Sequence, residues 1–311
     1  MPAALVHQNL FRFGGGNNNI NAAYNQAFQQ IAGWLNPVPV AVVGLTEIQN
    51  DQAAAVAAAG IIASAGATYT ATIATRRTAV GLASDYTAFG INPGVAVHGY
   101  GRILITIPNN GIVLVNDPAP LPGSPQWAGW CSRLPSAAPL NPPADYQQLA
   151  FVIITIPPGN PIAVAFLHNI YSVNDNRGAM LQLLPDAADM IRLNAPLGPA
   201  STVSVCGDFN AVPQLRQNFQ GTVMTPLSQG TTTWHVNQNA QARLLPAQQA
   251  DGGVVGGTTM AGSLYDYSFT SAVGTQRAQI DTRTMERRPG GVPIPQMAGY
   301  MSDHVASILQ I

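Results

Sequence analysis

The sequence contains no lysine and only two glutamates among its 311 residues. Charged residues make up 9% of the chain, which is low for a soluble protein, and the formal net charge is −1. A protein that holds duplex nucleic acid through many phosphate contacts is normally more basic, so the composition excludes binding through a broad basic surface. All 13 basic residues are arginines, and arginine suits bidentate contact with a phosphate group.

The absence of lysine has two explanations, and the sequence leaves both open. A GC-rich genome would also account for the alanine-rich stretches of the chain. Escape from ubiquitination is the other explanation, because that modification targets lysine. Some bacterial toxin subunits that enter host cells are lysine-poor in the same way.

Cysteine is equally scarce, and Cys131 and Cys206 are the only two. Cys206 lies in an apolar run, where a buried free thiol is expected, and the sequence does not support a disulfide between the two. No apolar run reaches membrane-spanning length, and the N-terminus has neither a basic start nor a long apolar stretch. We therefore expect no transmembrane segment and no signal peptide. The compartment stays undefined, with a secreted or translocated bacterial effector as one interpretation.

Apolar residues, in contrast, make up 47% of the chain, which is enough for a large core. Their periodicity predicts helices at 20–35, 51–64 and 175–193, the last bent or interrupted at Pro185. The expected strands are 3–8, 38–45, 68–75, 79–84, 95–98, 102–107, 112–115, 149–156, 161–168, 202–206, 263–270 and 305–311. This order predicts an α+β fold, a four-layer α/β/β/α sandwich of two mainly antiparallel sheets packed face to face with helices outside.

Two stretches do not follow this pattern. Residues 117–147 hold eight prolines, with Trp127 and Trp130 between them, and residues 221–262 are rich in glycine, glutamine and threonine. We interpret both as irregular insertions in a single domain that spans 1–311. The two tryptophans either cover the core under a long loop or dock a protein partner or substrate, because aromatic residues are favoured at interfaces.

Several polar side chains stand where apolar runs end or begin, a position that converges on one edge of the sheets in layered α/β proteins. They are Asn9, Glu47, His168, Asp208, Asn210 and His304. Glu47 ends a strand expected to be buried, so a hard cation or hydrogen bonds must compensate its charge. The alternatives are structural: a helix N-cap at Glu47, an Asx turn at Asp208 and Asn210, and packing for His7.

Taken together and in order, these segments resemble the endonuclease/exonuclease/phosphatase superfamily, which has the DNase I-like fold. The matching segments are ALVHQNLFRFGG, VVGLTEIQND, RRTAVGLAS, FLHNIYS, VCGDFNAVP, LYDYSFTSA and MSDHVASILQI. The GDFN and SDH signatures, in the correct order after a glutamate strand, make the combination specific. The resemblance covers most of 3–311 and skips the two irregular stretches.

The resemblance implies a phosphodiesterase that depends on Mg²⁺ or Mn²⁺, most simply a nuclease that hydrolyses DNA, as the toxin-type nucleases of this superfamily do. The implied metal ligands are Asn9, Glu47 and Asp303. The implied catalytic residues are His168, Asp208, Asn210, Asp266 and His304. In this scheme His304, oriented by Asp266, activates the attacking water or binds the phosphoryl oxygens, and His168 acts on the leaving group. Asn210 and Arg77 are the expected substrate contacts.

Three positions depart from the family pattern. The segment Arg76-Arg77-Thr78-Ala79 lacks the acid that partners the first catalytic histidine, which leaves the partner of His168 undefined. Gln49 and Gln147 stand where the DNase I branch has arginine. These losses, with the near-neutral charge, favour an alternative: a phosphoesterase acting on a phospholipid or inositol phosphate, as sphingomyelinase-like relatives do. The lack of a recognisable lipid-facing apolar hairpin argues for the nuclease.

Overall fold

The computed structural model describes most of the predicted strands and two helices. The described residues are 3–13, 40–48, 52–63, 69–78, 85–106, 111–115, 145–169, 177–195, 197–210, 235–236, 265–271, 277–281, 304 and 306–311. Their helices and strands are β1 Ala4–Phe13, β2 Val40–Ile48, α2 Gln52–Ile62, β3 Tyr69–Thr78, β4 Asp85–Ile91, β5 Ala96–Thr106, β6 Gly111–Val115, β7 Asp145–Thr155, β8 Pro161–His168, α4 Arg177–Leu193, β9 Thr202–Asp208, β10 His235–Val236, β11 Asp266–Thr270, β12 Arg277–Asp281 and β13 Ala306–Gln310.

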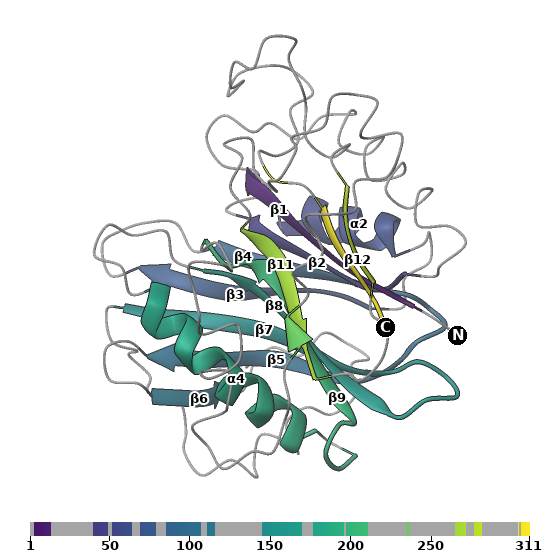
Figure 1. Ribbon diagram of the computed structural model, residues 1–311. Coiled ribbons are helices and arrows are strands. Elements are labelled where there is room, and N and C mark those ends of the chain that lie inside the picture. Colours follow the sequence, from purple (N-terminus) through teal and green to yellow (C-terminus); the bar gives the residue numbers. More distant parts are fainter. Residues whose placement is uncertain are drawn as a thin grey trace.

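The strands form one continuous hydrogen-bonded ladder that is folded into two sheets (Figure 1). The first sheet has the order β12-β13-β1-β2-β4-β3, and the second has β10-β11-β9-β8-β7-β5-β6. Three residue pairs between the ends of β3 and β7, from Arg76–Gln147 to Thr78–Asp145, join the two sheets along one edge. The pairs β1–β2 and β8–β9 are parallel, and the other described pairs are antiparallel. The predicted mainly antiparallel sheets are therefore confirmed, with two parallel exceptions.

The two sheets pack face to face on a core to which both contribute. Leu5, Val42 and Phe89 come from the first sheet, and Phe166 and Cys206 come from the second. Gly44 allows the closest approach, because a Cβ atom at this position would lie 2.2 Å from Phe166 Cδ1. A larger residue at position 44 would push the sheets apart where they carry the candidate site.

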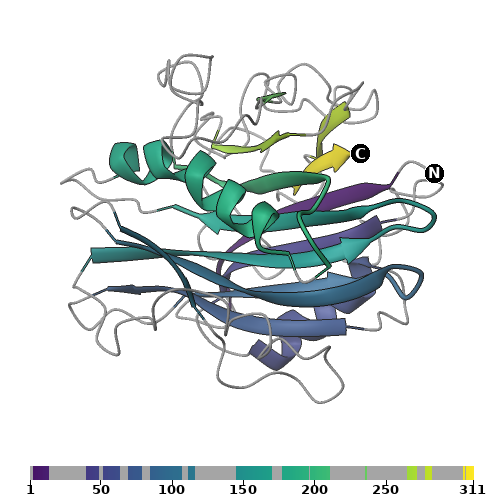
Figure 2. The ribbon, with the colours of Figure 1, turned by 90° about the horizontal axis from the view of Figure 1, so that it is seen from below.

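The two helices cover the outer faces of the sandwich, one on each side (Figure 2). Helix α2 packs its alanines against Val43, Leu45 and their neighbours in the first sheet. Helix α4 buries Leu184, Ala187 and Ile191, which lie on one helical face, against the second sheet. The predicted sandwich of two sheets is thus confirmed, with one described helix on each outer face. No described helix is long and apolar enough to cross a bilayer.

Several predicted boundaries were wrong. Strands β1 and β2 continue past Asn9 and Glu47, so both side chains lie inside strands. Helix α4 continues through Pro185, so the predicted interruption there is wrong. β5 is a single strand where two were predicted, since a bulge between Val97 and Gly99 keeps it paired with β7. β4 and β12 were not predicted.

One further boundary differs from its prediction, and three predictions fall on residues that the structure does not describe. Strand β7 begins at Asp145, inside the stretch expected to be irregular up to residue 147, because residues 145–147 pair with β3. The predicted helix at 20–35, the predicted strand at 79–84 and most of 221–262 lie outside the described residues.

Candidate active site

Three neighbouring strands of the second sheet place three predicted residues in one row. Strands β8 and β9 are parallel and in register, with His168 opposite Asp208. Strand β11 is antiparallel to β9, with Asp266 opposite Asp208. Cross-strand neighbours project to the same side of a sheet, so the three side chains share one face at one end of these strands. All three are buried.

The first sheet supplies the facing residues. Asn9 on β1 donates from Nδ2 to Asp208 Oδ2 at 2.9 Å, a buried hydrogen bond between the two sheets. His304 precedes β13, and its backbone carbonyl accepts a 3.0 Å hydrogen bond from Gln8 Nε2. The same Gln8 nitrogen donates to the Asn9 carbonyl at 2.7 Å. Gln8 therefore fixes the backbone of His304 to the strand that carries Asn9.

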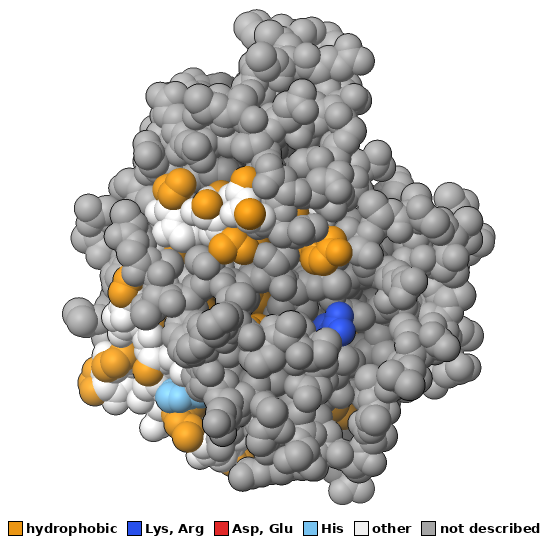
Figure 3. All heavy atoms as spheres, turned by 180° about the vertical axis from the view of Figure 1, so that it is seen from behind, with side chains coloured by type: hydrophobic (Ala, Val, Ile, Leu, Met, Phe, Trp, Pro, Cys, Tyr) orange, Lys and Arg blue, Asp and Glu red, His pale blue; other side chains and the backbone are white. Residues whose placement is uncertain are grey.

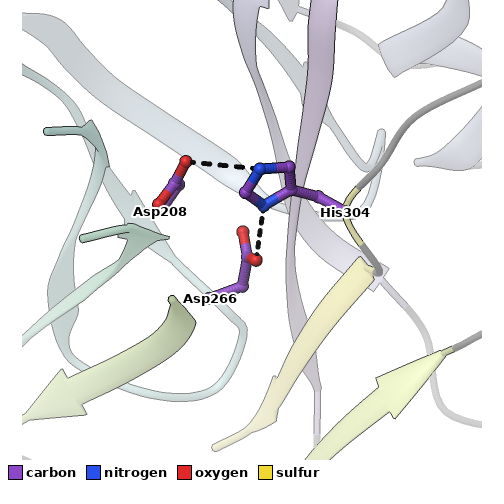
Figure 4. Close-up of side chains that lie close together, drawn as sticks. All are labelled: Asp208, Asp266 and His304. Carbon is purple, nitrogen blue, oxygen red and sulfur yellow. Dashed lines mark hydrogen bonds and ion pairs between the residues drawn. The ribbon is translucent and has the colours of Figure 1, made fainter. Parts of the chain in front are cut away.

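The ring of His304 lies between two buried carboxylates (Figure 4). Its Nδ1 is 2.7 Å from Asp266 Oδ2, and its Nε2 is 3.7 Å from Asp208 Oδ2. A short contact with a carboxylate places the Nδ1 proton on the Asp266 side, so Nε2 is the atom that faces the site. His304 is 7% exposed and Asp266 is fully buried, which shields this pair from solvent.

The second imidazole approaches the same carboxylate from β8. His168 Nε2 lies 3.8 Å from Asp208 Oδ2 and 3.7 Å from Glu47 Oε2. The sequence left the charge partner of His168 undefined, and the structure places Glu47 and Asp208 beside it. Both imidazoles and the Asn9 amide therefore surround one oxygen atom, Asp208 Oδ2.

Backbone strain marks two of the predicted site residues. Glu47 has φ 57° and Asn210 has φ 49°, and they are the only described non-glycine residues with positive φ. This left-handed conformation is unfavourable for residues with a Cβ atom, although asparagine tolerates it better than glutamate does. The Asn210 backbone N–H donates to Asp208 Oδ1 at 2.8 Å, which forms the Asx turn that the sequence offered as a structural alternative. Such strain concentrates at functional sites, and no sequence pattern revealed it at Glu47.

His7 lies directly behind the His304–Asp266 pair. Its Nε2 is 2.9 Å from Thr46 Oγ1, and its Nδ1 is 3.8 Å from Asp266 Oδ1. Burial lowers the pKa of His7 to about 3, so the ring is neutral in the folded protein at ordinary pH. The structure thus bears out its interpretation as a packed residue. Its position two residues before Asn9, on the same side of β1, is the signal for its proximity to the site.

Asn169 was missed by the sequence analysis. It follows His168, is fully buried, and donates from Nδ2 to the Phe209 carbonyl at 3.0 Å. The Asn210 side chain in turn donates to the Asn169 carbonyl at 2.8 Å. The only signal in the sequence was its place directly after a histidine that ends an apolar strand.

The donor set fits a divalent cation with oxygen ligands. Glu47, Asp208 and Asp266 bring three carboxylates into a site that is largely shielded from water, and a cation offsets their repulsion. Asp208, Asp266 and His304 have potential ligand atoms within 4.8 Å of one another. We favour Glu47 and Asn9 as ligands instead, because His304 and Asp266 already share a 2.7 Å hydrogen bond.

The remaining predicted functional residues lie outside what the structure describes. They are Asp303, the side chain of Arg77, and Trp127 and Trp130 of the candidate docking loop. Cys131 also lies outside it, whereas Cys206 is a buried free thiol, as predicted. Burial raises the pKa of Cys206 to about 12, so this thiol is unreactive at neutral pH.

Comparison with protein-family models matches residues 9–304 to the endonuclease/exonuclease/phosphatase family. No curated protein gives a significant sequence match.

Solved structures share the fold over almost the whole chain. An endonuclease/exonuclease/phosphatase family protein from Bacteroides thetaiotaomicron has a TM-score of 0.57 at 12% identity, covering 100% of this chain and 97% of that one. The human Nocturnin catalytic domain has a TM-score of 0.54 at 13% identity, covering 99% and 93%. Truncated TDP2 from Caenorhabditis elegans has a TM-score of 0.53 at 11% identity, covering 99% and 96%. At these identities the likeness concerns the fold.

Proposed function

This chain belongs to the endonuclease/exonuclease/phosphatase family, and we propose that it is a nuclease that hydrolyses DNA. Membership of this family makes the chain a metal-dependent phosphodiester hydrolase. One observation carries the proposal. Two imidazole nitrogens, of His168 and His304, lie 3.8 and 3.7 Å from the same buried oxygen, Asp208 Oδ2. Two histidines and a carboxylate at one point supply the proton transfers and the charge that phosphodiester hydrolysis needs.

His304 is the general base in this proposal. Asp266 accepts the Nδ1 hydrogen bond, so the lone pair on Nε2 is directed toward the position of an attacking water. When Nε2 takes the proton, the buried Asp266 carboxylate stabilises the imidazolium that forms. Asp208, whose Oδ2 lies 3.7 Å from that nitrogen, shares in orienting the water.

His168 acts on the opposite side of the phosphate. The carboxylates of Glu47 and Asp208 near its Nε2 stabilise an imidazolium, which donates its proton to the leaving oxygen. The Asn210 side-chain amide supplies a hydrogen bond that orients the phosphate, and Arg77 is proposed as a further phosphate contact. His168 and Asn210 are each 6% exposed, so bulk solvent has little access to their polar atoms.

Asn9, Glu47 and Asp303 would hold the metal, for which we propose Mg²⁺ or Mn²⁺. When bound, the ion supplies Lewis-acid polarisation of the phosphate and stabilises charge on the leaving oxygen. The Asn9 amide nitrogen is directed to Asp208, so its oxygen is the atom suited to coordination. Glu47 Oε2 lies 3.7 Å from His168 Nε2, so this carboxylate belongs to the same site.

The charge distribution supports a substrate held locally. The net charge is −1. Among the described side chains on the face shown in Figure 3, hydrophobic ones form several patches. A long duplex footprint needs many basic contacts, so we expect binding through the site itself. The same observation favours the second candidate function, a phosphoesterase acting on a phospholipid or inositol phosphate.

One comparison of substrates separates the two functions. The purified protein is assayed for plasmid nicking with Mg²⁺ or Mn²⁺ and with EDTA, beside release of headgroups from sphingomyelin and phosphate from phosphoinositides. We expect nicking that EDTA abolishes and no turnover of either lipid. Lipid turnover without nicking would replace the nuclease with the second function. Inactivity on all three substrates would contradict both.

A further inference from the structure

Asn169 forms hydrogen bonds with three consecutive residues, 208–210, at the end of β9 and directly after it. Its backbone N–H donates to the Asp208 carbonyl at 2.8 Å, which extends the β8–β9 pairing by one residue. Its Nδ2 donates to the Phe209 carbonyl at 3.0 Å, and its own carbonyl accepts from Asn210 Nδ2 at 2.8 Å. Asn169 is fully buried, so water does not compete for these bonds.

The segment that Asn169 contacts contains Asn210, one of the two described non-glycine residues with positive φ. Asn210 has φ 49°, and such a conformation persists only where the surroundings fix it. The preceding residue, Phe209, is held from both sides. Its N–H donates to the Tyr265 carbonyl at 2.8 Å, and its carbonyl accepts from the Asn169 side chain. The Asn169 amide therefore acts on the peptide that leads directly into Asn210.

We propose that Asn169 is a positioning residue for phosphodiester hydrolysis. Its side-chain amide fixes the Phe209–Asn210 peptide, and so holds the Asn210 amide at a set position relative to Asp208 and His168. The inference rests on the proposed role of Asn210 at the phosphate. The inference requires a hydrogen-bond donor in the side chain at position 169, because that side chain contacts the Phe209 carbonyl oxygen. An aspartate there would have the same shape but only acceptors when ionised.

A double-mutant cycle tests whether Asn169 acts through Asn210. Hydrolysis of bis(4-nitrophenyl) phosphate with Mn²⁺ is measured for the wild type, Asn169→Ala, Asn210→Ala and the double variant. We expect Asn169→Ala to lower kcat about tenfold with KM changed less than about twofold. In the Asn210→Ala background the same change should lower kcat less than about twofold. An equal loss of kcat in both backgrounds overturns the proposal.

Two further variants separate positioning from folding. Asn92→Ala is the matched control: Asn92 Nδ2 donates to the Ala63 carbonyl at 3.3 Å, and the residue follows β4 at the end of the sheet remote from Glu47. It should retain the wild-type kcat. Asn169→Asp keeps the side-chain size and is carried through the same cycle if Asn169→Ala does not melt cooperatively. Asn169→Asp with wild-type kcat would overturn the requirement for a donor.

A measurement without substrate keeps this inference distinct from the proposed function. Hydrogen exchange of the Asn210 backbone amide, which donates to Asp208 Oδ1, is followed by NMR. We expect exchange at least roughly tenfold faster in Asn169→Ala and unchanged in Asn92→Ala. Unchanged exchange in Asn169→Ala overturns the positioning role even in an active nuclease. Faster exchange in a protein that cuts no DNA contradicts only the nuclease proposal.

Discussion

The two ends of the sandwich carry the same kind of polar pair in opposite surroundings. At the site end, His7 Nε2 lies 2.9 Å from Thr46 Oγ1, and both residues are fully buried. At the other end, His98 Nε2 lies 2.8 Å from Thr155 Oγ1, and the ring is partly exposed. The two hydrogen bonds have similar lengths, and the pairs differ in how deeply they are buried. Burying polar groups has a free-energy cost, so the full burial of the pair at the site end needs a functional explanation.

The site end also carries conformational and electrostatic costs. Glu47 and Asn210 have positive φ there, and three carboxylates lie close together. At the opposite end, β7 and β8 are joined by the exposed turn at 157–160, which is built from the turn-forming residues proline, glycine and asparagine. The contrast indicates that the site end is shaped by chemistry and the other end by folding.

The sharpest test of this contrast replaces a histidine at each end. We expect His304→Ala to lower turnover by at least roughly a hundredfold, because the general base is lost, and Asp208→Ala to do the same. Both variants should melt as the wild type does. His98→Ala is the matched control at the remote end, and we expect normal turnover. Normal activity in either site variant would refute the role assigned to that residue.

The metal provides the next test, since among the described residues a donor set suited to a divalent cation is found at the site end. Mn²⁺ at about 100 times its dissociation constant should stabilise the wild type by about 2.7 kcal/mol, measured by denaturant unfolding. Glu47→Gln should lose most of this gain, because it removes a charged ligand. Glu286→Gln, which changes the other glutamate in the chain, is the control and should keep the full stabilisation by Mn²⁺. Full stabilisation of Glu47→Gln by Mn²⁺ would exclude Glu47 as a ligand.

Close packing of the sheets beside the site predicts a smaller effect. Gly44→Ala places a Cβ atom 2.2 Å from the Phe166 ring, and overpacking of this kind costs about 1–3 kcal/mol of unfolding free energy. Gly94→Ala is the comparison at the other end, where the new atom would be 3.3 Å from the Asn92 side chain. Urea denaturation should show little change for Gly94→Ala. Equal stability of both variants would mean that the sheets adjust at Gly44.

The sequence predicted the architecture and most of the site because two kinds of signal were local. Apolar periodicity found most of the strands, although β4, β10 and β12 were not predicted, and β8 was predicted at its observed bounds, 161–168. The GDFN and SDH signatures led to Asp208, Asn210 and His304, which the structure brings together with Asp266.

What the sequence missed depends on tertiary contacts. The extension of β1 and β2 past Asn9 and Glu47 comes from their pairing with each other, and no local pattern encodes it. Asn169 gains its importance from a partner 40 residues away, Phe209. The left-handed conformation at Glu47 is likewise set by its surroundings, since glutamate has no intrinsic preference for it.

The smallest effect concerns the acid stability of the two histidine–threonine pairs. His7 has a pKa of about 3 in the folded protein and an ordinary value of 6.5. Between these values the unfolded chain binds a proton at His7 that the folded chain does not, so the free energy of unfolding falls as pH is lowered. The contribution of the neutral His7 ring to the free energy of unfolding is fully present above pH 6.5. As the pH falls from 6.5 toward 3, this contribution is lost at up to about 1.4 kcal/mol per pH unit.

Replacing the titrating ring should remove this pH dependence. In metal-free buffer, the wild type should lose more unfolding free energy between pH 6.5 and 5 than His7→Gln does, with urea denaturation as the measurement. His98→Gln should differ less from the wild type, because burial lowers the pKa of the partly exposed His98 ring to a smaller extent. Equal slopes for His7→Gln and the wild type would mean that the His7 ring is protonated in the folded protein, paired with Asp266 as an ion. His7 would then belong to the charged part of the site, and the neutral support assigned to it behind the His304–Asp266 pair would be wrong.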